Sequence, residues 1–217
     1  IHGLGSIGVI SSRLSLEGPV GNGSWFIGGR RTYLELIKGL IGEDPTEPLP
    51  DYNFYDLNAK VTQDITENDK IFISGFLSAD NMSYDAYGTD MEMELANKLF
   101  SARWTHIFSD NLFTVLNVSG SNYFNYFAGD QSGYGFEIEN SITDYTIKGS
   151  AEWFISDNLT AKFGFETNNY TFKYIQNIMD QSDSVGRNDP NGLTVKDWNH
   201  SIYGQTNYLI NDLLSVQ

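Results

Sequence analysis

The chain has 217 residues, of which 14% are aromatic and 21 are glycine, a composition that favours an all-β protein. It contains no cysteine, which excludes a disulfide framework, and 13 basic against 28 acidic residues give a net charge of −15. That charge repels a phosphate backbone and argues against a nucleic-acid partner. No apolar run reaches the roughly 18 residues of a membrane helix, so we follow the alternation typical of strands.

Two strands are expected in the first part of the chain, at residues 7–17 and 24–36, on either side of the turn GPVGNG. A long loop should follow from Ile37 to Asp51, because this stretch holds three of the five prolines and several acidic side chains. Residues 55–62 then alternate apolar and polar side chains in a clear strand pattern. After the turn ITENDK, a fourth strand is expected at residues 71–78.

The middle of the chain continues this succession of strands and connections. Acidic residues cluster between Asp80 and Glu94, which predicts a second long loop, with a helical turn in MEMELANKLF. A fifth strand should end in ARWTHIF, and after the turn SDN a sixth should begin at Leu112. A third long loop is expected from Phe127 to Glu137.

The clearest unit is the hairpin from Thr143 to Tyr170, in which two alternating runs flank the turn ISDN. Each run has one apolar and one polar face, because successive strand side chains point to opposite sides. Asp157 and Asn158 tolerate the left-handed backbone that a tight antiparallel connection needs. The chain should then end with a fourth long loop from Ile175 to Asp197, a strand around 201–208, the turn IND and a strand from Leu213.

The tight turns ITEND, FSDN, ISDN and IND recur about every 50 residues, so they all fall on one side and the four long loops on the other. This arrangement is typical of transmembrane barrels, which have short periplasmic turns and long extracellular loops, whereas soluble sandwiches spread their loop lengths over both ends. We therefore predict an all-β, antiparallel up-and-down transmembrane β-barrel, present as a partial barrel of about nine to ten strands.

The alternation assigns side chains to the two surfaces of this barrel. Aliphatic residues at mid-strand, with aromatic residues near the strand ends, are expected to face lipid or form aromatic girdles; these are Tyr55, Leu57, Val61, Trp104, Tyr145, Ile147, Trp153, Phe163 and Phe165. The opposite side carries too many charges for a sandwich core and suits a watery or plugged lumen. The residues expected to face the lumen or a plug are Arg13, Glu17, Asp56, Asn58, Lys60, Lys148, Glu152, Lys162 and Glu166.

Five segments carry a family likeness: GVISSRLSLEGPV, GSWFIGGRRTYLELI, YDLNAKV, ARWTHIFSDNLF and DYTIKGSAEWFISDNLTAKFGFE. They resemble the early barrel of TonB-dependent outer-membrane receptors of the Bacteroidota type, which often carry an N-terminal carboxypeptidase-regulatory-like domain. The resemblance implies a barrel of about 22 strands around a plug, and active uptake coupled to an inner-membrane energy complex. Against this pattern, residues 1–217 are expected to contain neither the plug nor the TonB-contacting box and to cover only part of the barrel.

The expected domain is therefore one outer-membrane β-barrel in the bacterial cell outer membrane, of which residues 1–217 are a part that is incomplete at both ends. Its expected partners are outer-membrane lipid and lipopolysaccharide, the receptor's own plug domain, the TonB complex and an unknown extracellular ligand. The acidic loops fit a cationic or calcium-bridged ligand, or simply a solvated surface. The alternatives are a passive porin or adhesin barrel and an outer-membrane hydrolase, which an Asp-His pair on the loops would indicate.

Candidate catalytic and metal-binding chemistry is scarce. His2, His106 and His200 lie far apart in the sequence, without cysteine or paired carboxylates at ligand spacing. The segment DQSDSVGRNDPNG, with Asp180, Asp183 and Asp189, lacks the register of a calcium-binding loop. GGRR at residues 28–31 is not followed by a helix start, so it does not form a phosphate loop. We expect no enzymatic activity and no cofactor.

Overall fold

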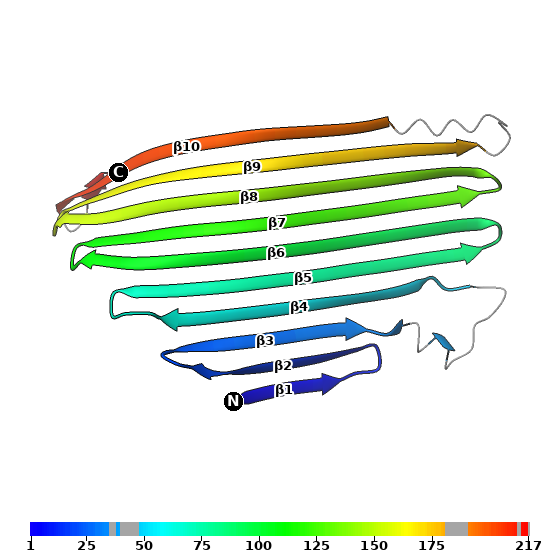
Figure 1. The fold of residues 1–217 in the computed structure, drawn as a ribbon, viewed down its shortest axis with the longest axis horizontal. Helices are drawn as coiled ribbons and strands as arrows, with labels where there is room; N and C mark the ends of the chain where they lie inside the picture. Colours follow the sequence, from blue (N-terminus) through cyan, green and yellow to red (C-terminus); the bar gives the residue numbers. More distant parts are fainter. Residues whose placement is uncertain (35–37, 40–47, 181–190, 212–213, 217) are drawn as a thin grey trace.

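The computed structural model describes residues 1–34, 38–39, 48–180, 191–211 and 214–216. Over these residues the chain forms one antiparallel sheet of eleven strands in which every strand pairs with its neighbours in sequence, from β1 to β11 (Figure 1). The expected all-β, up-and-down architecture is confirmed, although the sheet has eleven strands where about nine to ten were expected. β1 and β11 lie at its two edges.

The strands lengthen toward the middle of the sheet, to more than 20 residues in β6 and in β8 to β10. Their bounds are β1 His2–Ile7, β2 Ser11–Val20, β3 Gly23–Thr32, β4 Asp51–Asp64, β5 Asp69–Ala86, β6 Thr89–Ser109, β7 Leu112–Gln131, β8 Tyr134–Ser156, β9 Leu159–Asp180, β10 Asn191–Asn211 and β11 Leu214–Val216. A strand that crosses a bilayer at a tilt needs only about 9 to 11 residues. The central strands are therefore about twice as long as a membrane requires.

The connections between strands lie at the two ends of the strands, which we call the turn edge and the loop edge of the sheet (Figure 1). The turn edge, on the left in Figure 1, carries the expected tight turns, which include residues 65–68, 110–111 and 157–158. The loop edge, on the right, carries the β3–β4, β5–β6, β7–β8 and β9–β10 connections. These three expected tight turns are confirmed on the turn edge, but tight turns are not confined to it, because the β5–β6 and β7–β8 connections on the loop edge are two-residue turns.

The prediction of a long loop is wrong at two of the four places. The stretch from Asp80 to Glu94 is strand apart from a two-residue turn at Tyr87 and Gly88, and the stretch from Phe127 to Glu137 is strand apart from Ser132 and Gly133. All four turn residues have positive φ, between 54° and 90°. This geometry is typical of type I′ hairpin turns, which connect long twisted strands without a loop.

The other differences lie at strand ends. The expected first strand begins inside a hairpin, because β1 ends at Ile7 and β2 begins only at Ser11; β3 stops at Thr32 instead of residue 36. The helical turn expected in MEMELANKLF is wrong, since this stretch belongs to β6. The expected loop 37–51 lies largely outside the described residues, and of the expected loop 175–197 only residues 181–190 do, because β9 and β10 occupy the rest.

The sheet is a single layer, so the described part of the chain has almost no core. Ala79 and Ala161 are the buried hydrophobic residues there, whereas Ile202 is 88% exposed and Tyr145 62% exposed. Sheets normally bury an apolar face against a second layer, and the described elements provide none. Within the same residues, no helix has both the length and the apolar character needed to span a bilayer.

Candidate functional site

Strand register places the two predicted sets of residues on opposite faces of the sheet. Residues directly opposite each other in paired strands point to the same side, and side chains alternate along each strand. Tyr55 thus shares a face with its β5 partner Ala79, and Asp56 shares the other face with Ser78. Followed across β2 to β10, the Tyr55 face carries every residue expected to face lipid, and the Asp56 face carries every residue expected to face the lumen.

The Tyr55 face has an apolar band beside the turn edge. In β8 it reads Trp153, Ala151, Gly149, Ile147 and Tyr145, with an aromatic ring at each end and small or aliphatic residues between. The distance along the strand from Trp153 to Tyr145 is about 26 Å at about 3.3 Å per residue, or about 20 Å across a bilayer at the usual tilt of about 40°.

In β10 the same face carries Tyr208 and Trp198 as the outer aromatic residues, with Thr206, Gly204, Ile202 and His200 between them. The strand covers about 33 Å between the two rings, or about 25 Å across a bilayer at the same tilt. Both estimates match the apolar height of outer-membrane barrels, which is about 25 Å and is flanked by aromatic girdles.

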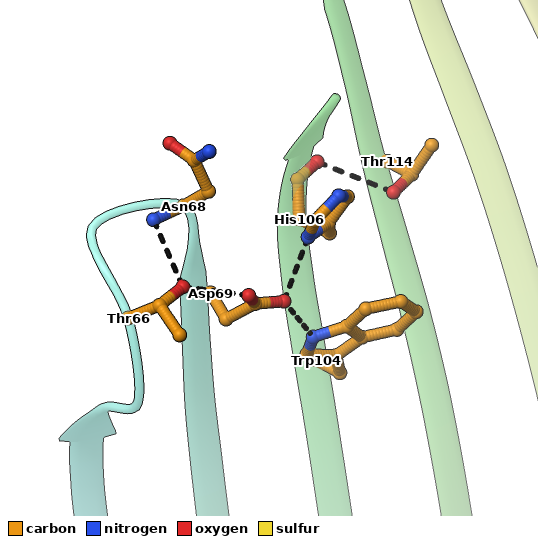
Figure 2. A network of polar contacts seen from close by, with 6 residues as sticks. All are labelled: Thr66, Asn68, Asp69, Trp104, His106 and Thr114. Atoms are coloured by element: carbon orange, nitrogen blue, oxygen red, sulfur yellow. Dashed lines mark hydrogen bonds and ion pairs between the residues drawn. The ribbon is translucent and has the colours of Figure 1, made fainter. Parts of the chain in front are cut away.

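Polar contacts on the turn edge anchor one of these girdle residues, Trp104 of β6 (Figure 2). The Asp69 carboxylate, at the first position of β5, accepts hydrogen bonds from Thr66 Oγ1 at 2.6 Å and from Trp104 Nε1 at 2.9 Å. His106 Nδ1 lies 2.7 Å from the same carboxylate, and Thr114 Oγ1 donates to the His106 carbonyl at 3.2 Å. The cluster joins three strands and the β4–β5 turn.

The hydrogen bond from Thr66, then those with His106 and Trp104, lower the pKa of Asp69 to about 2. Asp69 therefore stays ionised over the physiological range. The Asp69–His106 pair lies at the turn edge, opposite the edge with the expected long loops. It does not form the loop-borne Asp-His pair that would indicate a hydrolase.

The Asp56 face is polar at the level of the apolar band. Arg30 Nε pairs with Asp56 Oδ2 at 2.8 Å, and Lys148 Nζ pairs with Glu166 Oε2 at 2.8 Å. Glu152 and Lys162 occupy directly paired positions in β8 and β9. Between these charges, Asn–Ser and Asn–Thr hydrogen bonds link neighbouring strands, as in Ser101–Asn117 and Asn168–Thr146. Cross-strand pairs of this kind stabilise a sheet while they present polar groups to one side.

A hollow of about 500 Å³ opens on the Asp56 face and brings together two of the expected lumen residues, Asp56 and Asn58. Its other lining residues are Arg30, Tyr52, Phe54, Tyr55, Phe76, Ser78 and Asp80. Tyr52 Oη donates a hydrogen bond to Asp80 Oδ1 at 3.0 Å, and Arg30 lies 4.6 Å above the centre of the Phe54 ring. Desolvation by burial and then the bond to Asp80 raise the pKa of Tyr52. These contacts link the side chains of β3, β4 and β5 that line the hollow.

The sequence suggests acidic partners for Arg30 but does not give its face, because the double glycine before it obscures the alternation; register pairs it with Asp56. The sequence does not predict the Asp69 cluster, because Asp69 belongs to the expected turn ITENDK. Register alone brings Asp69 opposite His106. The sequence signal that could have found the cluster is the W-x-H alternation of Trp104 and His106, which places both rings on one side of a strand.

The three histidines lie apart from one another. His106 belongs to the Asp69 cluster, His200 lies 2.9 Å from Thr167 Oγ1 and is stacked on Trp198, and His2 is in β1. In the part of the chain that the structure describes, no three His, Asp or Glu side chains are placed to hold a metal ion. The weak calcium-loop candidate at residues 180–189 falls almost entirely outside the described residues.

No protein-family model and no curated protein matches the sequence, but solved structures share its fold. FpvA of P. aeruginosa, solved with bound pyoverdines, matches 97% of this chain with a TM-score of 0.69 and 10% identity. The RagAB peptide importer in its open-open state matches 93% with a TM-score of 0.64 and 13% identity. The outer membrane transporter YddB from Escherichia coli matches 92% with a TM-score of 0.57 and 12% identity.

The chain spans about a third of the length of these proteins, with shares of 34%, 30% and 36% respectively. At these identities the likeness is one of fold. The long antiparallel strands and the two-sided chemistry described above agree with it. The chain therefore has the fold of part of the β-barrel of outer-membrane receptors and transporters.

Proposed function

We propose that the chain is part of an outer-membrane receptor barrel that takes up an extracellular ligand with energy supplied from the inner membrane. The observation that carries this proposal is the apolar band of the Tyr55 face, bounded by aromatic rings from Trp153 to Tyr145 in β8. A single-layer sheet with this face exposed to water would be unstable, whereas lipid hydrocarbon covers it at no cost in desolvation.

In this proposal the Tyr55 face meets lipid and the Asp56 face lines the lumen or contacts the receptor's own plug. The ion pairs Arg30–Asp56 and Lys148–Glu166 then lie on the water-filled or plugged side, where water or polar groups solvate their charges. The turn edge faces the periplasm, and the loop edge faces the cell exterior, where lipopolysaccharide surrounds the barrel. The Asp69 cluster then lies at the periplasmic interface of the outer membrane, where a Trp ring and a polar anchor are favourable.

The length of the strands favours a receptor over a small porin. β8 has 23 residues, and the part from Tyr134 to Thr143 lies beyond the apolar band. Strands of this length raise the barrel wall well above the membrane and enclose a deep outer vestibule. RagAB is a peptide importer and YddB an outer membrane transporter; for this chain we propose uptake driven through TonB, and a receptor of the Bacteroidota type.

Uptake by cells that express the full-length protein tests this proposal. Compounds that such cells remove from the medium, and that deletion cells leave behind, identify the transported ligand. Their removal should stop when a protonophore collapses the inner-membrane gradient, because the receptor cycle depends on that gradient. Removal that continues at the same rate and rises linearly with external concentration would instead establish a passive porin. If no compound is removed, and the protein only attaches cells to surfaces, it is an adhesin.

A further inference from the structure

The two faces of the sheet exchange their chemistry between the apolar band and the loop edge. Next to the turn edge the Tyr55 face is apolar and the Asp56 face is polar. Toward the loop edge, Met82, Met93, Phe127 and Ile138 form one continuous row on the Asp56 face, each paired with the next across β5, β6, β7 and β8. The apolar surface therefore moves from the lipid side to the lumen side as the strands leave the membrane.

Acidic residues accompany this reversal on the opposite side. The row Glu94, Tyr126 and Glu139 and the row Glu92, Ala128 and Glu137 both lie on the Tyr55 face. Asp85 and Asp90, beside the Tyr87–Gly88 turn, are paired on the same face. Of the acidic residues in the expected loop 80–94, Asp85, Asp90, Glu92 and Glu94 thus point to the outer side of the wall, whereas Asp80 lies on the Asp56 face and is paired with Leu95.

From β5 to β8 the inner side of this part of the wall carries no charge, although Asp80 borders it and Asp197 of β10 lies on the same face. On the Asp56 face, β5 beyond Asp80, β6 before Arg103, β7 beyond Tyr123 and β8 before Asp144 contain no Asp, Glu, Lys or Arg at a described position. Its polar groups are amides and hydroxyls, as in the Asn140–Asn125 hydrogen bond of 3.3 Å. Apolar walls with a few fixed polar groups are typical of small-molecule sites.

Methionine is concentrated on this inner wall. Three of the four methionines of the chain lie there: Met82 is paired with Met93, and Met91 is paired with Tyr84. The thioether is flexible and polarizable, and methionine is used where a surface must adapt to different apolar ligands. Phe127 and Phe136 flank the methionines, with ring centres 5.2 Å apart.

The wall continues into β9 and β10 with exposed aliphatic residues. On the same face, Ile178 is 66% exposed and Leu193 is 52% exposed. Ile178 is paired with Phe136 and therefore adjoins the apolar row of β8. The row adjoins the polar lumen below it, so a molecule bound here would already be in the transport path.

We propose that this surface, the inner rim surface formed by Met82, Met93, Leu95, Phe127, Phe136 and Ile138, binds an uncharged organic ligand rich in apolar or aromatic groups. The inference rests on the proposed function and specifies its ligand class. It differs from the cationic or calcium-bridged ligand that acidic loops would fit, because Asp85, Asp90, Glu92 and Glu94 lie on the far side of the wall. A charged ligand would lose hydration on this surface, because its six residues carry no charge themselves.

Fluorescence of a polarity-sensitive label in the full-length receptor in nanodiscs tests this inference. The chain has no cysteine, so Met93→Cys carries the label on the inner side and Glu94→Cys carries it on the outer side. The probes are capped tetrapeptides of Ala, Leu and Phe, with lysine-rich and glutamate-rich peptides of equal length for comparison. The label at position 93 should shift to the blue in a saturable way, at a probe concentration at least tenfold lower for the apolar peptide. The label at position 94 should not respond.

Matched variants separate the two sides of the wall. Ile138→Glu, on the inner rim surface, should weaken apolar peptide binding at least tenfold, and Glu137→Gln, one residue away on the outer side, should leave it unchanged. Equal binding of charged and apolar peptides would overturn the inference, as would equal responses at positions 93 and 94. A label at position 93 that is shielded and unresponsive to every peptide would show that another part of the receptor covers the surface, and would also overturn it.

The same preparation distinguishes the inference from the proposed function. A receptor that inserts into nanodiscs and shows gradient-dependent uptake in cells, but has no preference for the apolar peptide, refutes only the ligand class. A full-length protein that does not insert into a membrane refutes both.

Discussion

Gly149 and Phe165 are direct partners across β8 and β9, and the Phe165 ring lies over the glycine so closely that a Cβ atom would overlap it. The ring fills the space that the missing side chain leaves on the apolar face. A comparable pair, Gly164 and Tyr203, occurs on the other face between β9 and β10. An aromatic ring that packs over a strand glycine replaces the side-chain contacts that the glycine cannot make.

Alanine at Gly149 should therefore destabilise the assembled barrel. The added methyl group forces the Phe165 ring out of its position, and such overpacking costs about 1–3 kcal/mol. Gly204→Ala is the matched control: it lies on the same face, and its Cβ would meet the Phe163 ring at an ordinary 3.7 Å. Reversible urea unfolding of the full-length protein from lipid vesicles measures both variants. Equal free energies of unfolding for the two would contradict this account.

Arginine substitutions at two adjacent residues test which face meets lipid. Ala151 lies in the apolar band of the Tyr55 face, and Ser150 lies on the Asp56 face. Ala151→Arg should cost about 2–4 kcal/mol, as for a lipid-facing charge near the bilayer midplane, and Ser150→Arg much less. The measurement is again unfolding from vesicles. Similar costs at both positions would mean that neither face is reserved for lipid.

The β5–β6 turn is expected to depend on Gly88. Gly88 has φ +73°, and an added Cβ would meet no atom within 4 Å, so alanine there tests backbone conformation alone. Gly88→Ala should cost about 1–2 kcal/mol, because a left-handed conformation is unfavourable for alanine. Hydrogen exchange of the amides beside the turn should accelerate about five- to thirtyfold.

The β7–β8 turn offers the opposite change. Ser132 already has φ +57°, and asparagine tolerates this conformation better than serine. Ser132→Asn should therefore slow hydrogen exchange of the amides beside its own turn. Faster exchange in this variant would argue against a type I′ turn.

The Asp69 cluster should make a pH-dependent contribution to stability. The folded-state pKa is lowered from 3.8 to about 2, so the contribution is fully present above the unfolded pKa and is lost as the pH falls from about 4 toward 2. The difference in unfolding free energy between the native protein and Asp69→Asn should be constant from pH 5 to 7 and shrink below pH 4. Trp104→Phe keeps a ring but removes one donor to the carboxylate, so its effect should be smaller. A difference that grows as the pH falls would contradict the assignment.

Much of the membrane-spanning part was predictable from sequence. In the hairpin Thr143 to Tyr170, a lipid-facing side must be apolar and the other side need not be, so the period-two pattern is strong. The turn ISDN marks the edge of the sheet with residues that tolerate left-handed backbone. Both predicted faces fell on opposite sides of the sheet for this reason.

The extensions beyond the band were misread because the pattern changes phase there. In β6, apolar residues occupy odd positions from Met91 to Leu99 and even positions from Phe100 to Trp104. Met, Glu and Leu are good helix formers, so the segment favoured a helical turn by local propensity alone. Pairing with β5 and β7 along its whole length overrides that propensity.

By itself the sequence determined that the chain is a meander of strands and where the turns ITEND, FSDN and ISDN lie, because side-chain alternation and turn residues are local properties. The tertiary structure decided how long the strands are and which side chains of neighbouring strands share a face. Met82, Phe127 and Ile138 lie far apart in sequence and form one row only through the register of β5 to β8. Register depends on hydrogen bonds between strands, and a shift of one residue would turn that row to the opposite side.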